Sequence, residues 1–502
     1  MPDCLTIFKD FPIGAPSGRG RTSFPREILL FFHEIFSKMS SLIYLGSLME
    51  YQAIIVGAGP AGIFSALTLM EKGIDGILLL EQGKGIRERT SSPSREILCG
   101  WGGAGAYSDG KLTFSPDVGG YLGEYMSPAS FRDLLSRTDG VFLRYGAPRE
   151  RLFGDFSPEV EALVERARRA ELEFIPNRIR HMGTENCRTV LCNLYDDLKD
   201  RIEIRTDCRA EAVLAEEGLA RGVRLEDGSV ERGRFVIAAP GRSGSRWMKD
   251  QAEALGLQTS VSPVDIGVRV ELPAAFLNEI TDLTYESKLV YYSRTFDDRV
   301  RTFCMNPGGE VVNERSGDLI TVNGHSFANR KSENTNFAIL VSSMFTEPFR
   351  DPIAYGRYIA QLANLLSGGT IVQRLGDLLA GRRSTRARID RCLTTPTLKQ
   401  AVPGDLSYVF PYRHLRDIIE MIEAMDRLAP GVSSRHTLLY GVEVKFYSNR
   451  IEVTEELETG VKNLFAVGDG AGLTRGLLQA AASGIVAAEA VADRLHHEPH
   501  DS

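Results

Sequence analysis

The residues best suited to chemistry begin at a glycine-rich turn, GAGPAG, at positions 57–62. An apolar run at 53–56 precedes this turn, and a helical pattern with Pro60 in its first turn follows it. Such glycines permit a tight bend and let a phosphate approach the backbone at a helix N-terminus, whose partial positive charge favours anions. Glu81, at the end of the next apolar run, is spaced to accept ribose hydroxyls. We therefore predict a dinucleotide site.

The sequence near the C-terminus indicates which dinucleotide binds. The segment LFAVGDGAG places Asp469 after an apolar strand, and the next helix begins near Leu477. A carboxylate here suits a ribityl hydroxyl, and the helix N-terminus can face an isoalloxazine edge that becomes negative on reduction. Because NAD has no ribityl chain, the pattern favours FAD. The alternative interpretation of Asp469 is a turn-forming aspartate before glycine.

Composition excludes several classes of protein. The chain has 502 residues, 43% hydrophobic and 25% charged, which is typical of a globular protein with more than one core. Its net charge of -7 disfavours nucleic acid as a partner, and no apolar run reaches the roughly 18 residues of a membrane span. Seven scattered cysteines without a CxxC pair predict reduced thiols, a cytoplasmic location and no metal site.

The pattern of elements predicts an α/β fold with two domains. A Rossmann-like FAD-binding domain, with a parallel sheet and a β-meander, is expected from residues 49–250 and 456–495, including a helical segment at about 116–200. Residues 251–455 are expected to form a mixed α+β substrate domain. We interpret residues 1–48 as a non-native or disordered extension. The alternative is an amphipathic helix that docks on a partner or a membrane surface.

Several motifs resemble known flavoproteins. GAGPAG, VIAAPGRSGS and VGDGAGLTRGLLQAAASG resemble the glutathione-reductase-like FAD superfamily. CGWGGAGAYSDGKL, GVRVELP, VNGHS and GDGAGLTRG look like a narrower group, the uncharacterised FAD-dependent dehydrogenases of bacteria and archaea. The resemblance covers essentially all of residues 49–495. It implies FAD and a fold, but no particular reaction.

The resemblance also implies which residues contact FAD. They come from the glycine turn, the end of the second strand, the glycine loop, the meander and the C-terminal strand and helix. The implied contacts are Gly57, Gly59, Pro60, Ala61, Gly62, Glu81, Gln82, Gly102, Gly103, Ala104, Gly105, Ala210, Pro240, Gly241, Gly468, Asp469, Gln479 and Ala480.

The sequence departs from the disulfide reductases of that superfamily. Those enzymes carry a CxxxxC pair after the first βαβ unit, where this chain has only Cys99. Cys187 and Cys192 have the spacing but fall in a helical stretch, on different faces. No second GxGxxG lies between residues 115 and 460. Either NADH or NADPH binds transiently as electron donor, or the reductant is something else.

Three residues are candidates for catalysis. Cys99 is a candidate thiolate, with a small buried apolar residue as the alternative. Lys111, beside Asp109, is a candidate for stabilising a reduced flavin anion, with a solvated turn as the alternative. His325 in VNGHS is a candidate acid or base, with a structural histidine as the alternative.

Two other segments favour structural roles. His181 is expected in a loop before a helix capped by Thr184. The arginines of GRRSTRARIDR, at 381–391, favour a solvated face over an anion grip.

We predict an FAD-dependent oxidoreductase that transfers hydride through flavin N5 to or from a small molecule. A flavoprotein monooxygenase and an FAD-dependent tRNA-modifying or RNA-binding protein are the alternatives, together with a protein in which FAD is only structural. The sequence leaves the substrate and the oligomeric state open.

Overall fold

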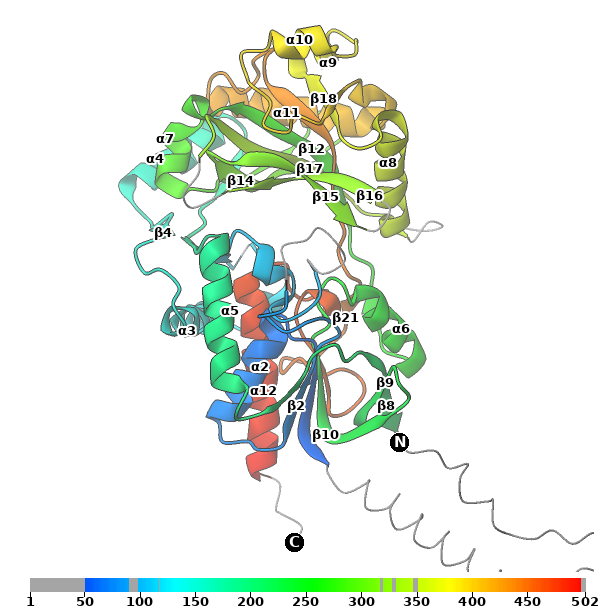
Figure 1. Ribbon diagram of the computed structural model, residues 1–502. Coiled ribbons are helices and arrows are strands. Elements are labelled where there is room, and N and C mark those ends of the chain that lie inside the picture. Colours follow the sequence, from blue (N-terminus) through cyan, green and yellow to red (C-terminus); the bar gives the residue numbers. More distant parts are fainter. Residues whose placement is uncertain are drawn as a thin grey trace, which may run out of the picture. The chain divides into compact units, whose positions relative to one another are not determined.

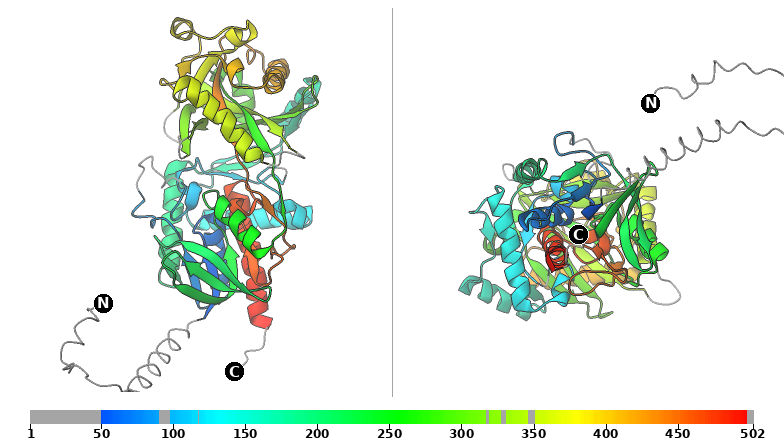
Figure 2. Two further views of the ribbon diagram at one scale, coloured as in Figure 1. Left: turned by 90° about the vertical axis from the view of Figure 1, so that its right-hand side faces the viewer. Right: turned by 90° about the horizontal axis from the view of Figure 1, so that it is seen from below.

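The computed structural model describes residues 50–89, 98–116, 118–316, 319–326, 331–345 and 351–497. The prediction about residues 1–48 lies outside the described residues. Within them, the chain builds two large sheets, each with its own hydrophobic core. The sheets appear in separate layers in two perpendicular views (Figure 1, Figure 2).

The first sheet has a parallel part in the order β7-β2-β1-β10-β22. Its strands are β1 (Tyr51–Val56), β2 (Ile77–Leu80), β7 (Glu203–Arg205), β10 (Val230–Ala238) and β22 (Leu464–Ala466). All of β2 and nearly all of β1 are buried, as expected where helices cover both faces of a parallel sheet.

An antiparallel meander extends this sheet. The first half of β10 pairs with β9 (Leu219–Leu225), which pairs with β8 (Ala210–Glu216). Since β22 lies more than two hundred residues after β10 yet pairs with it, the sheet is discontinuous in sequence. The predicted Rossmann-like sheet is therefore confirmed.

Helices α2 (Pro60–Glu71) and α12 (Leu477–His497) pack side by side on the first sheet (Figure 1, Figure 2). Pro60 occupies the first turn of α2. A Cβ atom on Gly484 of α12 would lie 2.1 Å from the Ala61 carbonyl oxygen of α2. Ser65 donates a hydrogen bond to the Gly484 carbonyl at 3.0 Å. The two backbones are in direct contact because no side chain separates them.

Helices α3 (Pro128–Arg144) and α5 (Thr184–Leu198) contribute to the same core. A small sheet, in the order β3-β6-β4, lies beside them in the chain. It comprises β3 (Lys111–Thr113), β4 (Leu152–Phe153) and β6 (Ile179–His181). Helix α6 (Ser245–Leu255) follows β10.

The second sheet has eight strands in the order β19-β18-β20-β12-β17-β14-β13-β5. They are β5 (Glu173–Ile175), β12 (Val264–Pro273), β13 (Lys288–Tyr292), β14 (Arg299–Pro307), β17 (Asn334–Ser343), β18 (Ile371–Arg374), β19 (Val402–Pro403) and β20 (Leu438–Lys445). Helices α8 (Pro352–Ser367) and α11 (Tyr412–Leu428) pack on its apolar face.

Strand β12 shows how this sheet treats its two faces. Ile266, Val268 and Val270 belong to the apolar core under the helices. The alternate residues Asp265 and Arg269 are equally buried but charged. Because strand side chains alternate between faces, the second face of the sheet is a buried polar surface.

One segment differs from the predicted domain boundary. Helix α4 (Pro158–Arg169) and strand β5 come from the stretch assigned to the FAD-binding domain. In the structure β5 pairs with β13, and Leu163 and Ala167 of α4 join the core of the second sheet. The apolar stripe of α4 is buried on that sheet.

The remaining elements connect these layers. They include β11 (Thr259–Ser260), α7 (Asn278–Thr284), β15 (Glu310–Ser316), β16 (Leu319–His325), α9 (Leu375–Leu379), α10 (Arg386–Asp390) and β21 (Arg450–Ile451). Among the described residues, the structure contains no helix with the length and apolar character needed to traverse a bilayer.

The contact between α2 and α12 makes a test of packing possible. Gly484→Ala should lower the stability of the protein by about 1–3 kcal/mol, because the new methyl group overlaps the Ala61 backbone. Gly140→Ala in α3 is the matched control, since its Cβ meets no atom within 4 Å. That variant should be neutral or slightly stabilising. Thermal melts of both proteins measure the difference, and equal melting temperatures would contradict the packing argument.

Candidate functional site

A cavity of about 1160 Å³ lies between the first sheet and the polar face of the second sheet. Residues at or just after the carboxyl ends of four parallel strands line it: Val56, Leu80, Ala239 and Gly468. In open α/β sheets, ligands bind at this edge. Strands β13, β14 and β20 of the second sheet supply the facing wall.

The N-terminus of α2 opens into this cavity. Gly57 has φ +106°, and a Cβ there would lie 2.2 Å from the Ala239 carbonyl oxygen, so only glycine fits the turn. A Cβ on Gly59 would meet no protein atom within 4 Å. No side chain caps the helix at Gly59. The first backbone N–H groups of α2 are thus available to an anion such as a pyrophosphate.

Two of the predicted cofactor residues make close packing contacts. A Cβ on Gly62 would lie 1.8 Å from the Gly57 carbonyl oxygen, so this glycine lets α2 approach the turn. A Cβ on Gly102 would lie 2.4 Å from Leu191 of α5. Neither residue lines the cavity. The other predicted cofactor residues do line it: Gly57, Gly59, Pro60, Ala61, Glu81, Gln82, Gly103, Ala104, Gly105, Ala210, Pro240, Gly241, Gly468, Asp469, Gln479 and Ala480.

Glu81 organises the loops around the cavity. Its buried carboxylate accepts hydrogen bonds from the backbone N–H groups of Ala58 at 2.8 Å, Gly83 at 2.9 Å and Gly100 at 2.9 Å. A carboxylate has about four acceptor positions, so about one remains for a ligand. The prediction that Glu81 accepts both ribose hydroxyls therefore has room for one such bond.

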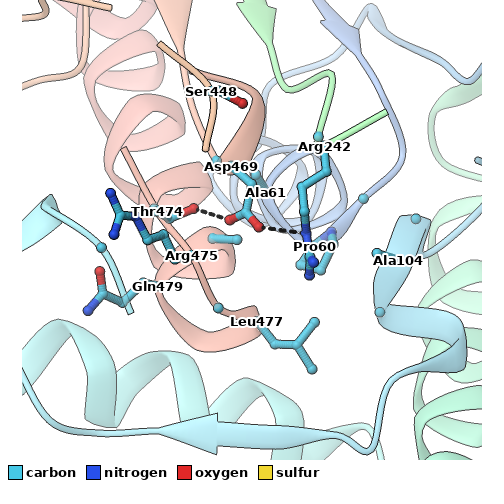
Figure 3. A pocket seen from close by; sticks show the side chains of 18 of the residues that line it. Pro60, Ala61, Ala104, Arg242, Ser448, Asp469, Thr474, Arg475, Leu477 and Gln479 are labelled. Carbon is cyan, nitrogen blue, oxygen red and sulfur yellow. Dashed lines mark hydrogen bonds and ion pairs between the residues drawn. The ribbon is translucent and has the colours of Figure 1, made fainter. Parts of the chain in front are cut away.

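Asp469 also lines the cavity, between Thr474 and Arg242 (Figure 3). Its carboxylate accepts a hydrogen bond from Thr474 at 2.7 Å and pairs with Arg242 at 3.2 Å. Burial raises the pKa of Asp469, and Arg242 and Thr474 offset part of that rise. Held in this way, the carboxylate can accept a hydrogen bond from a ligand hydroxyl group.

Gln479, in the first turn of α12, is the clearest sign of an absent ligand. Its Nε2 donates to the Val118 carbonyl at 3.0 Å, while its buried Oε1 has no hydrogen-bond partner among the described residues. A buried polar atom without a partner is costly, so a donor on a ligand would satisfy it. Together with the open cradle at Gly59, this orphaned oxygen fits FAD.

The structure separates the three catalytic candidates. Lys111 lines the cavity with its side chain 8% exposed, and it does not lie in a solvated turn. Cys99 lies beside Gln82, which donates to its Sγ at 3.4 Å, and is not among the lining residues. His325 is half-buried at the end of β16 and does not line the cavity either.

Lys111 is held by charges from both parts of the structure. Its Nζ pairs with Asp109 at 3.1 Å and with Glu286 at 3.2 Å, and donates to the Met305 carbonyl at 2.9 Å. Burial lowers the pKa of Lys111, but Asp109, Cys304 and Glu286 outweigh it and hold that pKa well above its usual value. The ammonium group therefore stays charged at the cavity wall.

Cys304 lines the cavity although the sequence pattern did not mark it as a site residue. This residue lies in β14, with Sγ 3.9 Å from the Lys111 Nζ. Its φ of +45° coincides with a register shift between β14 and β17. Nothing in FCMNP distinguishes it from other cysteines, since the bulge depends on strand pairing.

His181 behaves as a structural residue. It lies in β6, fully buried, and Gly183 rather than Thr184 is the N-cap of α5. Its Nδ1 lies 2.8 Å from Arg151, and its Nε2 lies 3.1 Å from the Tyr285 hydroxyl. Burial, opposed by Asp109 and assisted by Lys111, lowers the pKa of His181 to about 4.

The arginines at 381–391 do not line the cavity. Arg382 pairs with the buried Asp377 of α9 at 3.0 Å, and Arg388 approaches the same carboxylate at 3.9 Å. The described cysteines are all free, including Cys187 and Cys192.

Comparison with known proteins adds a domain match. Residues 263–446 match the domain family described as "FAD-dependent protein, C-terminal domain-like". This stretch runs from the start of β12 through β20, so it includes the cavity wall of the second sheet. The chain is also 26% identical to an uncharacterised protein of Clostridium beijerinckii over 493 residues, covering 89% of this chain and 81% of that protein.

Weaker likeness extends to solved structures. L-proline dehydrogenase from P. horikoshii has 10% identity and a TM-score of 0.38, over 89% of this chain and 94% of that one. A geranylgeranyl bacteriochlorophyll reductase-like protein from Thermoplasma acidophilum has 13% identity and a TM-score of 0.38, over 89% and 79% of the two chains. These values are too low to bear on the activity of this chain.

The domain match, the open helix N-terminus at a glycine turn and the polar groups around Asp469 together define an FAD-dependent protein. The domain match confirms FAD as the predicted cofactor.

The cradle at Gly59 gives a test of the cofactor site. Gly59→Ala should sharply reduce bound FAD while leaving the melting temperature of the apoprotein nearly unchanged, because the added methyl group projects into the cavity and not into protein. Gly62→Ala should instead destabilise the fold, because its methyl group overlaps the Gly57 backbone. The ratio of flavin to protein absorbance and thermal melts separate the two effects. Full flavin content in Gly59→Ala would contradict the assignment.

Burial of His181 predicts a pH dependence of stability. The unfolded chain takes up a proton near pH 6.5, whereas the folded His181 stays neutral down to about pH 4. The contribution of His181 to the free energy of unfolding should therefore be constant above pH 6.5. It should fall as the pH drops from 6.5 to 4, by at most about 3 kcal/mol. His181→Gln should reduce that slope, and part should remain because burial also lowers the pKa of His414 to about 4. Urea unfolding of both proteins at pH 7, 6 and 5 measures the free energy of unfolding. The same pH dependence in the unchanged protein and in His181→Gln would argue against a neutral, buried His181.

Proposed function

We propose that the protein is an FAD-dependent dehydrogenase or reductase that transfers hydride to or from a small molecule bound in the cavity. The observation that carries this proposal is the continuity of the cavity. One space joins the nucleotide cradle at Gly59 and Asp469 to Lys111 of the small sheet and to a wall of the second sheet that includes Cys304. Its volume exceeds the roughly 300–1,000 Å³ of typical ligand pockets, which leaves room for a second molecule beside a dinucleotide.

The chain's own residues would hold the cofactor at three points. The N-terminus of α2 would bind the pyrophosphate, Glu81 a ribose hydroxyl, and Asp469 with Gln479 the ribityl and ring region. When bound, FAD supplies a flavin that accepts or donates hydride at N5.

Lys111 would act as the charge-stabilising group. Its Nζ is a permanent cation at the cavity wall, and Asp109 and Glu286 fix its position. A cation that is already held in position stabilises negative charge that develops during a reaction, because the site does not need to reorganise. Asp109 and Glu286 also line the cavity, so hydrogen-bond acceptors lie beside this cation.

The domain match and the uncharacterised relative from Clostridium beijerinckii support the narrower group to which the motifs point, the uncharacterised FAD-dependent dehydrogenases. The cytoplasmic location and the small-molecule substrate stay predictions. Arg382 and Arg388 pair with Asp377. This supports a structural role for the arginines at 381–391 and disfavours the RNA-binding alternative.

A spectrum and an anaerobic titration test the proposal. The purified protein should show flavin absorbance that bleaches with NADH, NADPH or an oxidisable substrate in the absence of oxygen. Lys111→Met should keep the flavin content but slow bleaching by roughly 10²-fold, since a preorganised charge is lost. Cys99→Ser is the control with unchanged bleaching, because Cys99 lies outside the cavity lining.

Three results would contradict or redirect the proposal. A protein without flavin, or with flavin that no donor bleaches, would contradict hydride transfer. Rapid NAD(P)H consumption that requires both substrate and oxygen would favour the monooxygenase instead.

A further inference from the structure

Three cations surround one aromatic ring at the cavity wall of the second sheet. Lys288 on β13, Arg301 on β14 and Lys445 on β20 line the cavity, and so does Phe303 on β14. The charged ends of these cations lie 5.1, 4.9 and 5.6 Å from the Phe303 ring centroid. Their side chains are at most 16% exposed. We call Lys288, Arg301 and Lys445 the cationic wall.

The carboxylates that hold two of these cations lie behind them. Arg301 pairs with Asp265, and Lys445 pairs with Glu443 at 3.1 Å. Asp265 and Glu443 are at most 2% exposed and do not line the cavity. Glu443 is shared with the fully buried Arg269, at 3.2 Å. Lys445 also approaches Glu314 of β15 at 3.8 Å, so the layering of positive charge toward the cavity and negative charge inside the sheet holds for the Arg301–Asp265 and Lys445–Glu443 pairs.

Lys288 differs because its partner, Glu286, also lines the cavity. That carboxylate is shared with Lys111. Burial tends to raise the pKa of Glu286, but Lys111 and Lys288 outweigh it and lower that pKa to about 2. Glu286 is thus a fixed anion shared by two cations, and Asp109 is the second anion that pairs with Lys111.

Phe303 holds the three cations together without neutralising them. The face of an aromatic ring attracts cations through its quadrupole but carries no charge. Lysine ammonium groups have three donors each, and arginine has five. Largely buried donors of this kind are strongly stabilised by an anion, particularly a carboxylate or phosphate.

We propose that the cationic wall is the subsite for a carboxylate or phosphate group on the molecule that exchanges hydride with the flavin. The inference rests on the proposed function, because that function identifies the reaction. The anion subsite itself depends only on residues of the second sheet. The shared chemistry is an anionic group with more than one oxygen. It belongs either to a small substrate or to the 2′-phosphate of NADPH.

Anion binding to the purified holoprotein tests the subsite. Isothermal titration calorimetry at low ionic strength would use inorganic phosphate, succinate, NADH and NADPH as separate probes. Lys288→Met and Lys445→Met are the test variants, because Glu286 keeps Lys111 and Glu443 keeps Arg269 as partners. Lys199→Met is the matched control, an ion-paired lysine at the end of α5, outside the cavity lining.

Binding of phosphate or succinate, weakened about tenfold or more in both variants and unchanged in Lys199→Met, supports a small anionic substrate. Tighter binding of NADPH than of NADH, with the preference lost in both variants, supports the subsite and assigns its anion to the donor. Equal affinity of all four proteins for every probe, or no binding of any probe, would overturn the proposal. Flavin absorbance of the same samples reports the proposed function separately, since an anion-binding protein without flavin would refute that function and retain the subsite.

Discussion

Direct contact between backbones at Gly57, Gly62 and Gly484 is the constraint on which the cavity depends. The turn at Gly57 touches the end of β10, Gly62 touches the turn, and α12 touches α2 at Gly484. These contacts fix the N-terminus of α2 relative to β1 and β10. They also bring the C-terminal segment beside α2, so that Asp469 and Gln479 face a cradle formed more than four hundred residues earlier. A methyl group at any of these positions would displace backbone, which cannot rotate away as a side chain can.

The second sheet faces a different constraint, which is buried charge. Its apolar face is covered by α8 and α11, so the opposite face is free to carry charged side chains. Asp265, Arg269 and Glu443 are buried there and paired. Buried pairs add little net stability compared with apolar residues of the same size. Their retention on the face toward the cavity is therefore better explained by the field they create than by the stability they provide.

Much of the first sheet could be predicted from local pattern, because a glycine turn between two apolar runs has few other solutions. Gly59, Glu81 and Asp469 line the cavity as the motif and its spacing indicate. Other features needed tertiary contacts that one sequence does not reveal. The packing of Gly102 against Leu191 depends on α5, and the exposure of Cys304 to the cavity depends on a bulge. The glycine loop divides its residues between packing and the cavity, and composition alone cannot separate the two.

Lys111 connects these two constraints. It begins β3, whose strand partner β6 belongs to the small sheet, yet its Nζ reaches Glu286 and the Met305 carbonyl in or beside the second sheet. The cation is thus both part of the cavity wall and a link between the parts that enclose the cavity. A ligand that draws on its charge must compete with Asp109 and Glu286, so ligand binding is coupled to the contacts that Lys111 makes with the second sheet. Because Glu286 also pairs with Lys288, that coupling extends to the cationic wall. An anion bound at the cationic wall would therefore change the interactions of Lys111, because the Glu286 carboxylate pairs with both Lys288 and Lys111.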